Sequence, residues 1–170
     1  MIYQEPKAYS LSDIVCWALQ SARALEFIHS KKHIHRDIKP QNLVLDKTFK
    51  ILKICDFGLA REISSFANSI VGTPLYIAPE IYGERPYNEK CDVYSWALTI
   101  RECFQRKRPF SECKTRMDLD SKKAQKDYKF GDIENGEINE LLQKCSAWMP
   151  AERYSMEYVR TKLEAFREQE

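Results

Sequence analysis

The run CDVYSWALTIRECF, from Cys91 to Phe104, constrains the fold of this chain more than any other feature. Drawn as a helix, it carries apolar residues on nearly every side. A helix that is apolar all round is normally buried rather than laid on a surface. The run therefore predicts a central buried helix with other helices packed around it. The 170 residues suffice for one domain with its own hydrophobic core.

Amphipathic segments on both sides of this run supply helices to pack against it. Ser10 to Asp13 resembles a capping box with Ser10 as the N-cap, and the apolar stripe that follows predicts a helix ending near Ser30. The stretch LVLDKTFKILKIC predicts two short strands joined by a polar turn around Asp46 and Lys47. Two later helices are indicated by the apolar positions Ile138, Leu141, Leu142 and Cys145 and by Met156, Val159, Leu163 and Phe166.

Two further stretches differ from these helical segments, the first in having no helical period and the second in being polar. Residues 64–87 are rich in Ser, Gly and Pro, which predicts a long loop, and long loops in compact domains are often functional. Residues 101–129 carry ten Lys or Arg against five Asp or Glu. We interpret this second stretch as a solvated connector, with a basic docking patch as the alternative.

Charge and cysteine content exclude several classes of protein. Lys plus Arg number 27 and Asp plus Glu 25, so the net charge of +2 gives no general attraction to nucleic acid or to membranes. No apolar run approaches the roughly 20 residues of a membrane span. The six cysteines form no CxxC pair, and we interpret them as buried reduced thiols, with metal or disulfide roles as alternatives. These features predict a reducing compartment, the cytosol or the nucleus, and of the two we expect the cytoplasm.

Polar residues suited to catalysis are concentrated in HRDIKPQN, residues 35–42. Alone, an Asp-Asn pair before a strand usually marks only a turn. Here it is followed by Asp-Phe-Gly at 56–58, by Ala-Pro-Glu at 78–80, by DVYSWA from Asp92, and by PAERYS around Arg153. In this set and order, the chain resembles the catalytic domain of protein kinases.

The resemblance implies a role for each polar residue in phosphoryl transfer from ATP with Mg²⁺. Asp37 would accept the proton of the substrate hydroxyl, and Lys39 would steady the transferring phosphate as a point charge. Asn42 and Asp56 would supply the hard oxygen ligands that Mg²⁺ prefers. Val44 would form the floor beneath the adenine ring. The expected cofactors are therefore ATP and Mg²⁺.

Other residues have structural or regulatory roles in this resemblance. Glu80 and Arg153 would form a buried salt bridge, and Asp92 would brace the backbone of the catalytic loop. Arg36, beside the catalytic Asp, suggests control by phosphorylation of the loop that follows, with Ser69 preferred over Ser64 and Ser65 as the acceptor. Plain loop serines without a regulatory role are the alternative.

Two features favour serine/threonine specificity over tyrosine specificity. These are Lys39 in HRDIKP and Thr73, a further predicted regulatory residue, in GTPLYIAPE. LKICDFGLA, YNEKCDVYSWALTI and ECFQRKRPF are most similar to the TGF-β-activated kinase group, which are MAP kinase kinase kinases. This similarity implies transfer of the γ-phosphate to Ser or Thr of a protein substrate, with another protein kinase as the expected substrate and a regulatory subunit as a candidate partner.

Residues 1–30 contain no Gly-rich phosphate loop and no strand lysine of the Val-Ala-Ile-Lys type. We therefore expect a mainly α fold that corresponds to the C-terminal lobe of a kinase domain. It would be a helical bundle with a few short β-strands at the catalytic loop, spanning residues 1–170, without the N-terminal lobe. On this expectation the chain alone binds nucleotide weakly and transfers little phosphate. The alternatives are an inactive truncated lobe acting as an interaction or decoy protein and, more remotely, nucleic-acid binding through residues 101–129.

Overall fold

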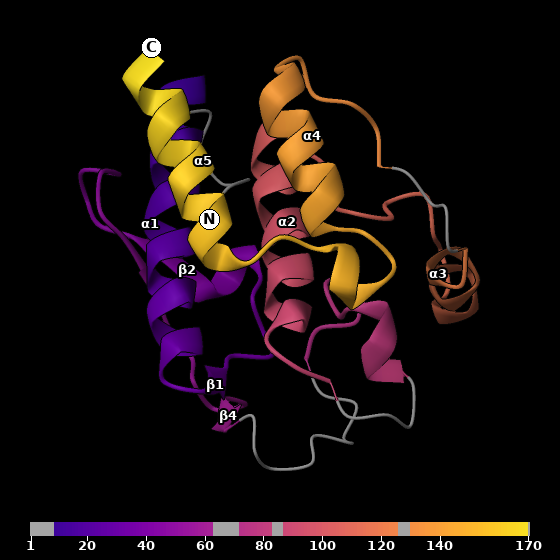
Figure 1. Ribbon diagram of the computed structural model, residues 1–170. Helices are drawn as coiled ribbons and strands as arrows, with labels where there is room; N and C mark the ends of the chain where they lie inside the picture. Colours follow the sequence, from indigo (N-terminus) through magenta and orange to yellow (C-terminus); the bar gives the residue numbers. More distant parts are fainter. Residues whose placement is uncertain (1–8, 63–71, 83–86, 126–129, 170) are drawn as a thin grey trace.

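The computed structural model describes residues 9–62, 72–82, 87–125 and 130–169 of the chain. Helices dominate it, as expected from the sequence, and the strands are short (Figure 1). The α-helices are α1 (Leu11–Ser30), α2 (Lys90–Gln105), α3 (Arg116–Lys123), α4 (Gly136–Cys145) and α5 (Met156–Gln169). Single 3-10 turns are formed by η1 (Pro40–Asn42), η2 (Pro79–Tyr82) and η3 (Pro150–Glu152).

Helix α2 is the buried centre of the fold, as its composition predicts. Every residue from Cys91 to Cys103 is buried. The helix packs against α1 on one side and α4 on the other, and Figure 1 shows α2 and α4 side by side. Trp96 is fully buried, and its indole nitrogen donates to Ser21 Oγ on α1 at 2.9 Å. This bond satisfies a donor that would otherwise be unpaired in the core.

The flanking helices begin and pack as their patterns predict. Ser10 caps α1 and forms the capping box with Asp13, and the helix ends at Ser30. Helix α5 lies along α1, where Arg160 donates to Glu26 at 2.7 Å. The apolar positions predicted for α4 are all buried, and those of α5 are buried except for Phe166, which is half-buried.

Two antiparallel strand pairs frame the stretch from residue 33 to residue 62. β2 (Leu43–Leu45) pairs with β3 (Leu52–Ile54), and the Asp46 carboxylate accepts from two backbone amides in the turn between them. β1 (His33–Ile34) pairs with β4 (Arg61–Glu62). This second pair has no recognisable sequence pattern because each strand contains only two residues.

The predicted solvated connector is wrong for several of its residues. α2 continues to Gln105, and the side chains of Arg101, Glu102 and Lys123 are all buried. Each of these side chains has a hydrogen-bond partner at least 26 residues away in the sequence. The high charge of this stretch therefore does not indicate exposure to solvent. The prediction of buried thiols also fails in part, because all six cysteines are free but Cys16, Cys55 and Cys113 are half-buried.

The predicted loop over residues 64–87 is partly described. It contains the turn η2, which the sequence pattern did not indicate. Ser64, Ser65 and Ser69 lie outside the described residues. In the part of the chain that the structure describes, no helix combines the length and apolar character needed to cross a membrane.

A buried ion pair ties η2 to the residues before α5. Arg153 donates through Nη1 and Nη2 to the two carboxylate oxygens of Glu80 at 2.7 and 2.8 Å. The side chain of Arg153 is 0% exposed and that of Glu80 17%. Arg153 also donates to the carbonyls of Ala147 and Trp148. The guanidinium is thus surrounded by acceptors, which is the condition for burying a charge.

We expect Glu80→Gln to reduce the free energy of unfolding by roughly 3 kcal/mol, because it leaves the buried Arg153 without its counter-charge. Urea denaturation of both proteins measures the difference. Arg23→Gln is the control, since it breaks the exposed pair of Arg23 with Glu164 and should cost no more than about 1 kcal/mol. Equal losses in the two variants would contradict the importance assigned to the buried pair.

Candidate active site

The loop that carries Asp37 is held in place by one buried carboxylate. Asp92, in the first turn of α2, accepts from the backbone amides of His35 and Arg36, both at 2.8 Å. His29, at the end of α1, places its Nε2 2.9 Å from the same carboxylate. Arg36 has φ of +70°, a left-handed conformation that is unfavourable for a side chain of this size. The hydrogen bonds that these two amides donate to Asp92 fix this conformation and so orient the next residue, Asp37.

Asp37, Lys39 and Thr73 form a closed set of hydrogen bonds. Lys39 Nζ donates to Asp37 Oδ2 at 2.6 Å and to Thr73 Oγ1 at 2.8 Å. Thr73 donates to Asp37 Oδ1 through its backbone amide at 3.0 Å and its hydroxyl at 2.9 Å. The carboxylate is therefore held at both oxygens, and a hydroxyl group already lies within hydrogen-bond reach of it.

The pKa of Asp37 reflects two opposing effects. Burial of this side chain, which is 8% exposed, acts to raise its pKa. The hydrogen bonds from Lys39 and Thr73 outweigh burial, so the pKa lies below its ordinary value. Because the pKa is lowered, the stability that ionised Asp37 contributes is present at neutral pH and is lost as the pH falls through the lowered pKa. Asp37 is thus a carboxylate at neutral pH, able to accept a hydrogen bond from a substrate hydroxyl.

The hairpin β2–β3 brings Asn42 and the residues before Asp56 together. Leu43 pairs with Ile54, and the amide of Cys55 donates to the carbonyl of Asn42 at 2.9 Å. Asn42 Nδ2 donates to the backbone carbonyl of Asp37 at 2.8 Å and to its Oδ2 at 3.1 Å. This bonding directs the amide nitrogen to Asp37 and leaves the oxygen of Asn42 as the atom that could ligate a cation.

The donor set suits Mg²⁺. Asn42 offers an amide oxygen, and the exposed Asp56 offers a carboxylate whose Oδ1 accepts from the Gly58 amide at 3.3 Å. These are the oxygen ligands that Mg²⁺ takes, usually one or two from the protein with phosphate and water completing the shell. Among the described residues, no group of three or more His, Cys, Asp and Glu could hold a metal.

The apolar residues beside these ligands are open to solvent. Val44, the predicted floor for adenine, is 42% exposed on β2, and Phe57 is 51% exposed. Phe57 contacts the His35 ring edge-on, with centroids 4.9 Å apart. Val44 thus has a free apolar face, and its contact with adenine stays a prediction.

Arg36, the predicted partner of a phosphate, already contacts two segments. Its Nε donates to the carbonyl of Leu59 at 2.5 Å and its Nη1 to the hydroxyl of Tyr87 at 3.3 Å. Arg36 therefore joins the Asp-Phe-Gly segment to the start of the α2 region. Because Ser69 lies outside the described residues, the proposed phosphate contact stays a prediction.

Sequence reasoning missed the contacts that hold the segment next to Asp37. It marked Thr73 as regulatory and did not foresee that Thr73 bonds Asp37 and Lys39. It also missed Tyr76, whose hydroxyl donates to Glu102 at 2.6 Å and whose carbonyl accepts from Ser95 Oγ at 2.8 Å. The available signal was the presence of Ser95 and Glu102 as polar exceptions in the apolar run of α2.

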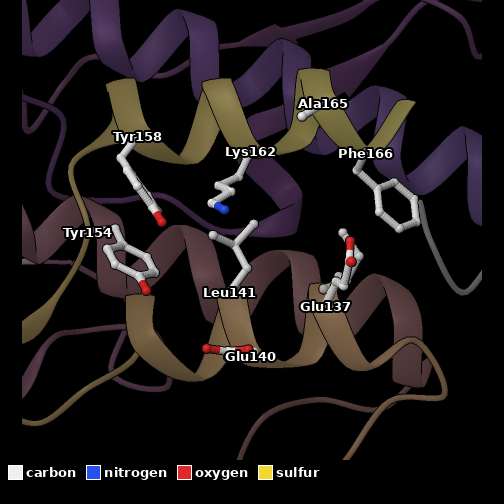
Figure 2. A pocket seen from close by; sticks show the side chains of 9 residues that line it. Glu137, Glu140, Leu141, Tyr154, Tyr158, Lys162, Ala165 and Phe166 are labelled. Atoms are coloured by element: carbon white, nitrogen blue, oxygen red, sulfur yellow. The ribbon is translucent and has the colours of Figure 1, made fainter. Parts of the chain in front are cut away.

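A pocket lies elsewhere, between α4 and α5. Figure 2 shows Leu141 of α4 opposite Lys162 of α5, with Tyr154 and Tyr158 at one end of the pocket and Glu137 and Phe166 at the other. The rings of Tyr154 and Tyr158 contact each other with centroids 4.3 Å apart. None of the lining residues belongs to the group around Asp37. We therefore locate the candidate active site by its polar groups and not by the depth of a cavity.

Residues 1–162 match the sequence model of the protein kinase domain. The chain belongs to the protein kinase family. It is 35% identical over 166 residues to mitogen-activated protein kinase kinase kinase 7 of Drosophila melanogaster, covering 89% of this chain. The human protein of that name is 39% identical over 61% of this chain, and the mouse serine/threonine-protein kinase Nek5 is 41% identical over 60%. The chain spans only 23%, 18% and 17% of the lengths of these three relatives.

We expect Thr73→Val to raise the pKa of Asp37, because the change removes the hydroxyl that donates to Oδ1 but keeps the shape of the side chain. The carboxyl ¹³C shift of Asp37, followed by NMR as the pH is lowered, measures this. Thr73→Ser keeps the hydroxyl and is the matched control, with a titration like that of the wild type. If the valine variant titrates like the wild type, the hydroxyl of Thr73 does not stabilise the carboxylate.

Proposed function

We propose that this chain carries the phosphoryl-transfer groups of a serine/threonine protein kinase of the MAP kinase kinase kinase type. On this proposal, residues 1–170 correspond to the C-terminal lobe of the kinase domain. The observation that carries the proposal is the hydrogen-bonded set of Asp37, Lys39 and Thr73, with Asn42 bonded to the same carboxylate. Membership of the protein kinase family supports protein phosphorylation as the general reaction. The hydroxyl bonded to Asp37 supports a hydroxyl side chain as the group that accepts the phosphate.

Asp37 is the group that would orient the acceptor. Its Oδ1 already accepts from a threonine hydroxyl at 2.9 Å, so a serine or threonine side chain of a substrate fits the same chemistry. Its lowered pKa keeps it ionised at neutral pH, and an ionised carboxylate can receive the hydroxyl proton. Lys39, bonded to Asp37, would place a positive charge beside the phosphate as it transfers.

Asn42 and Asp56 would hold the metal. When bound, Mg²⁺ neutralises charge on the phosphates of ATP. Asn42 bonds Asp37 through its amide nitrogen, so its amide oxygen is directed away from Asp37. The Cys55 amide donates to the Asn42 carbonyl, and Asp56 is the next residue after Cys55. Asn42 and Asp56 therefore lie at the same end of the hairpin β2–β3. Val44, exposed on β2, would meet the adenine ring.

The substrate and partners follow from similarity to the relatives. Proteins named mitogen-activated protein kinase kinase kinase 7 are among them, so we propose another protein kinase as the substrate. A regulatory subunit stays a candidate partner. The six free thiols suit a reducing compartment, and we propose the cytoplasm.

Phosphate transfer from γ-labelled Mg-ATP to a serine/threonine peptide mixture tests this function. We expect slow transfer by the purified chain, reduced at least about 10²-fold in Asp37→Asn and abolished in Asp56→Ala. Glu134→Gln, an exposed acidic position away from the site, is the control and should match the wild type.

The variants must be shown to fold by their unfolding transitions before the rates are compared. Transfer that is equal in the wild type and in Asp56→Ala would contradict the assignment of the metal ligand. A folded wild type with no transfer would favour a binding or decoy role instead.

A further inference from the structure

A lysine side chain is buried at the C-terminal end of α3, in the stretch whose sequence suggests a solvated connector. Lys123 is 5% exposed. Its Nζ lies 5.4 Å from the ring centroid of Phe110, 5.7 Å from that of Tyr82 and 6.0 Å from that of Tyr94. A lysine is almost never buried in this way unless polar partners compensate for its lost hydration.

Its partners are two backbone carbonyls next to the Asp37 set. Lys123 Nζ donates to the carbonyls of Pro74 and Ile77, both at 2.6 Å. Within the same segment, the amides of Tyr76 and Ile77 donate to the carbonyl of Thr73 at 2.9 and 3.2 Å. Residues 73–77 thus form a turn whose outward carbonyls are bound by one side chain from α3.

The charged groups around Lys123 do not supply a close counter-ion. Arg116 on its own helix disfavours the ammonium form, while Asp120 and Glu80 favour it. Burial dominates and lowers the pKa of Lys123 to about 7. No salt bridge to Lys123 occurs among the described residues. The carbonyls of residues 74 and 77 are therefore its main polar contacts.

We propose that Lys123 is a positioning residue, which binds residues 73–77 to α3 and so sets the position of Thr73 against Asp37. Thr73 donates twice to Asp37 and begins this turn, so a shift of the turn displaces both donors. Helix α3 is then a part of the active site although none of its residues contacts Asp37 in the described hydrogen bonds. This inference deepens the proposed function and rests on it for the role of Asp37, but its contacts can be tested without catalysis.

Amide hydrogen exchange of the whole chain, resolved by mass spectrometry, tests the proposal. In Lys123→Met, which keeps the length of the side chain but removes the donors, we expect exchange of peptides covering residues 74–77 to accelerate at least about tenfold. Lys123→Arg keeps both charge and donors and should restore most of the protection. Lys122→Met, at the half-buried position next to it on α3, is the matched control and should leave residues 74–77 protected.

The amide ¹H shift of Thr73 at neutral pH is the second measurement, because this amide donates to Asp37 Oδ1 and a purely structural lysine would not change it. We expect this shift to move upfield in Lys123→Met, since the donors on Thr73 become less ordered. The proposal is overturned if residues 74–77 keep their protection and the Thr73 amide keeps its shift. It is also overturned if Lys123→Met accelerates exchange in α2 and α5 equally or fails to fold, because Lys123 would then support the whole fold. Neither measurement requires phosphate transfer, so an inactive chain would count against the proposed function alone.

Discussion

The buried carboxylate of Asp92 is the contact on which the rest of this structure depends. It lies in the first turn of α2 and receives two backbone amides from the loop that carries Asp37. Each bond joins a charged acceptor to a neutral donor, and such bonds are stronger than those between neutral groups. They hold Arg36 in a left-handed conformation that would otherwise be unfavourable by about 1–2 kcal/mol. The helix that forms the core therefore also shapes the catalytic loop.

The face of helix α2 that carries Asp92 also supports the segment after Thr73. Asp92, Ser95, Thr99 and Glu102 are spaced three, four and three residues apart, which places them along one face of a helix. Ser95 and Glu102 bind the carbonyl and the hydroxyl of Tyr76. A polar stripe inside an apolar helix thus holds the loop before Asp37 and the segment after Thr73. The geometry of Asp37 relative to Thr73 follows from that one helix, assisted by Lys123 from α3 and by the ion pair of Glu80 with Arg153.

The sequence predicts those parts of the fold whose cause is local. The capping box at Ser10 is formed within four residues, and the burial of α2 follows from its own composition. The pair β1–β4 could not be predicted, since each strand has two residues and its partner lies far along the chain. Lys123 was misjudged for the same reason: its acceptors, Pro74 and Ile77, are 49 and 46 residues away. The identities of Asp37, Asn42 and Asp56 came from their motifs, whereas the contact of Thr73 with Asp37, across 36 residues, required the fold.

The dependence of the catalytic loop on α2 can be measured directly through the amides of His35 and Arg36. In Asp92→Asn the side chain keeps its size but loses its charge. An NH₂ group replaces one of the two oxygens, so a donor then faces a backbone amide that is also a donor. We predict that peptides containing His35 and Arg36 exchange amide hydrogens at least about tenfold faster in this variant, while those of α4 and α5 keep the wild-type rate. Unchanged protection of His35 and Arg36 in a folded Asp92→Asn protein would contradict the account, because the loop would then be held by something other than this carboxylate.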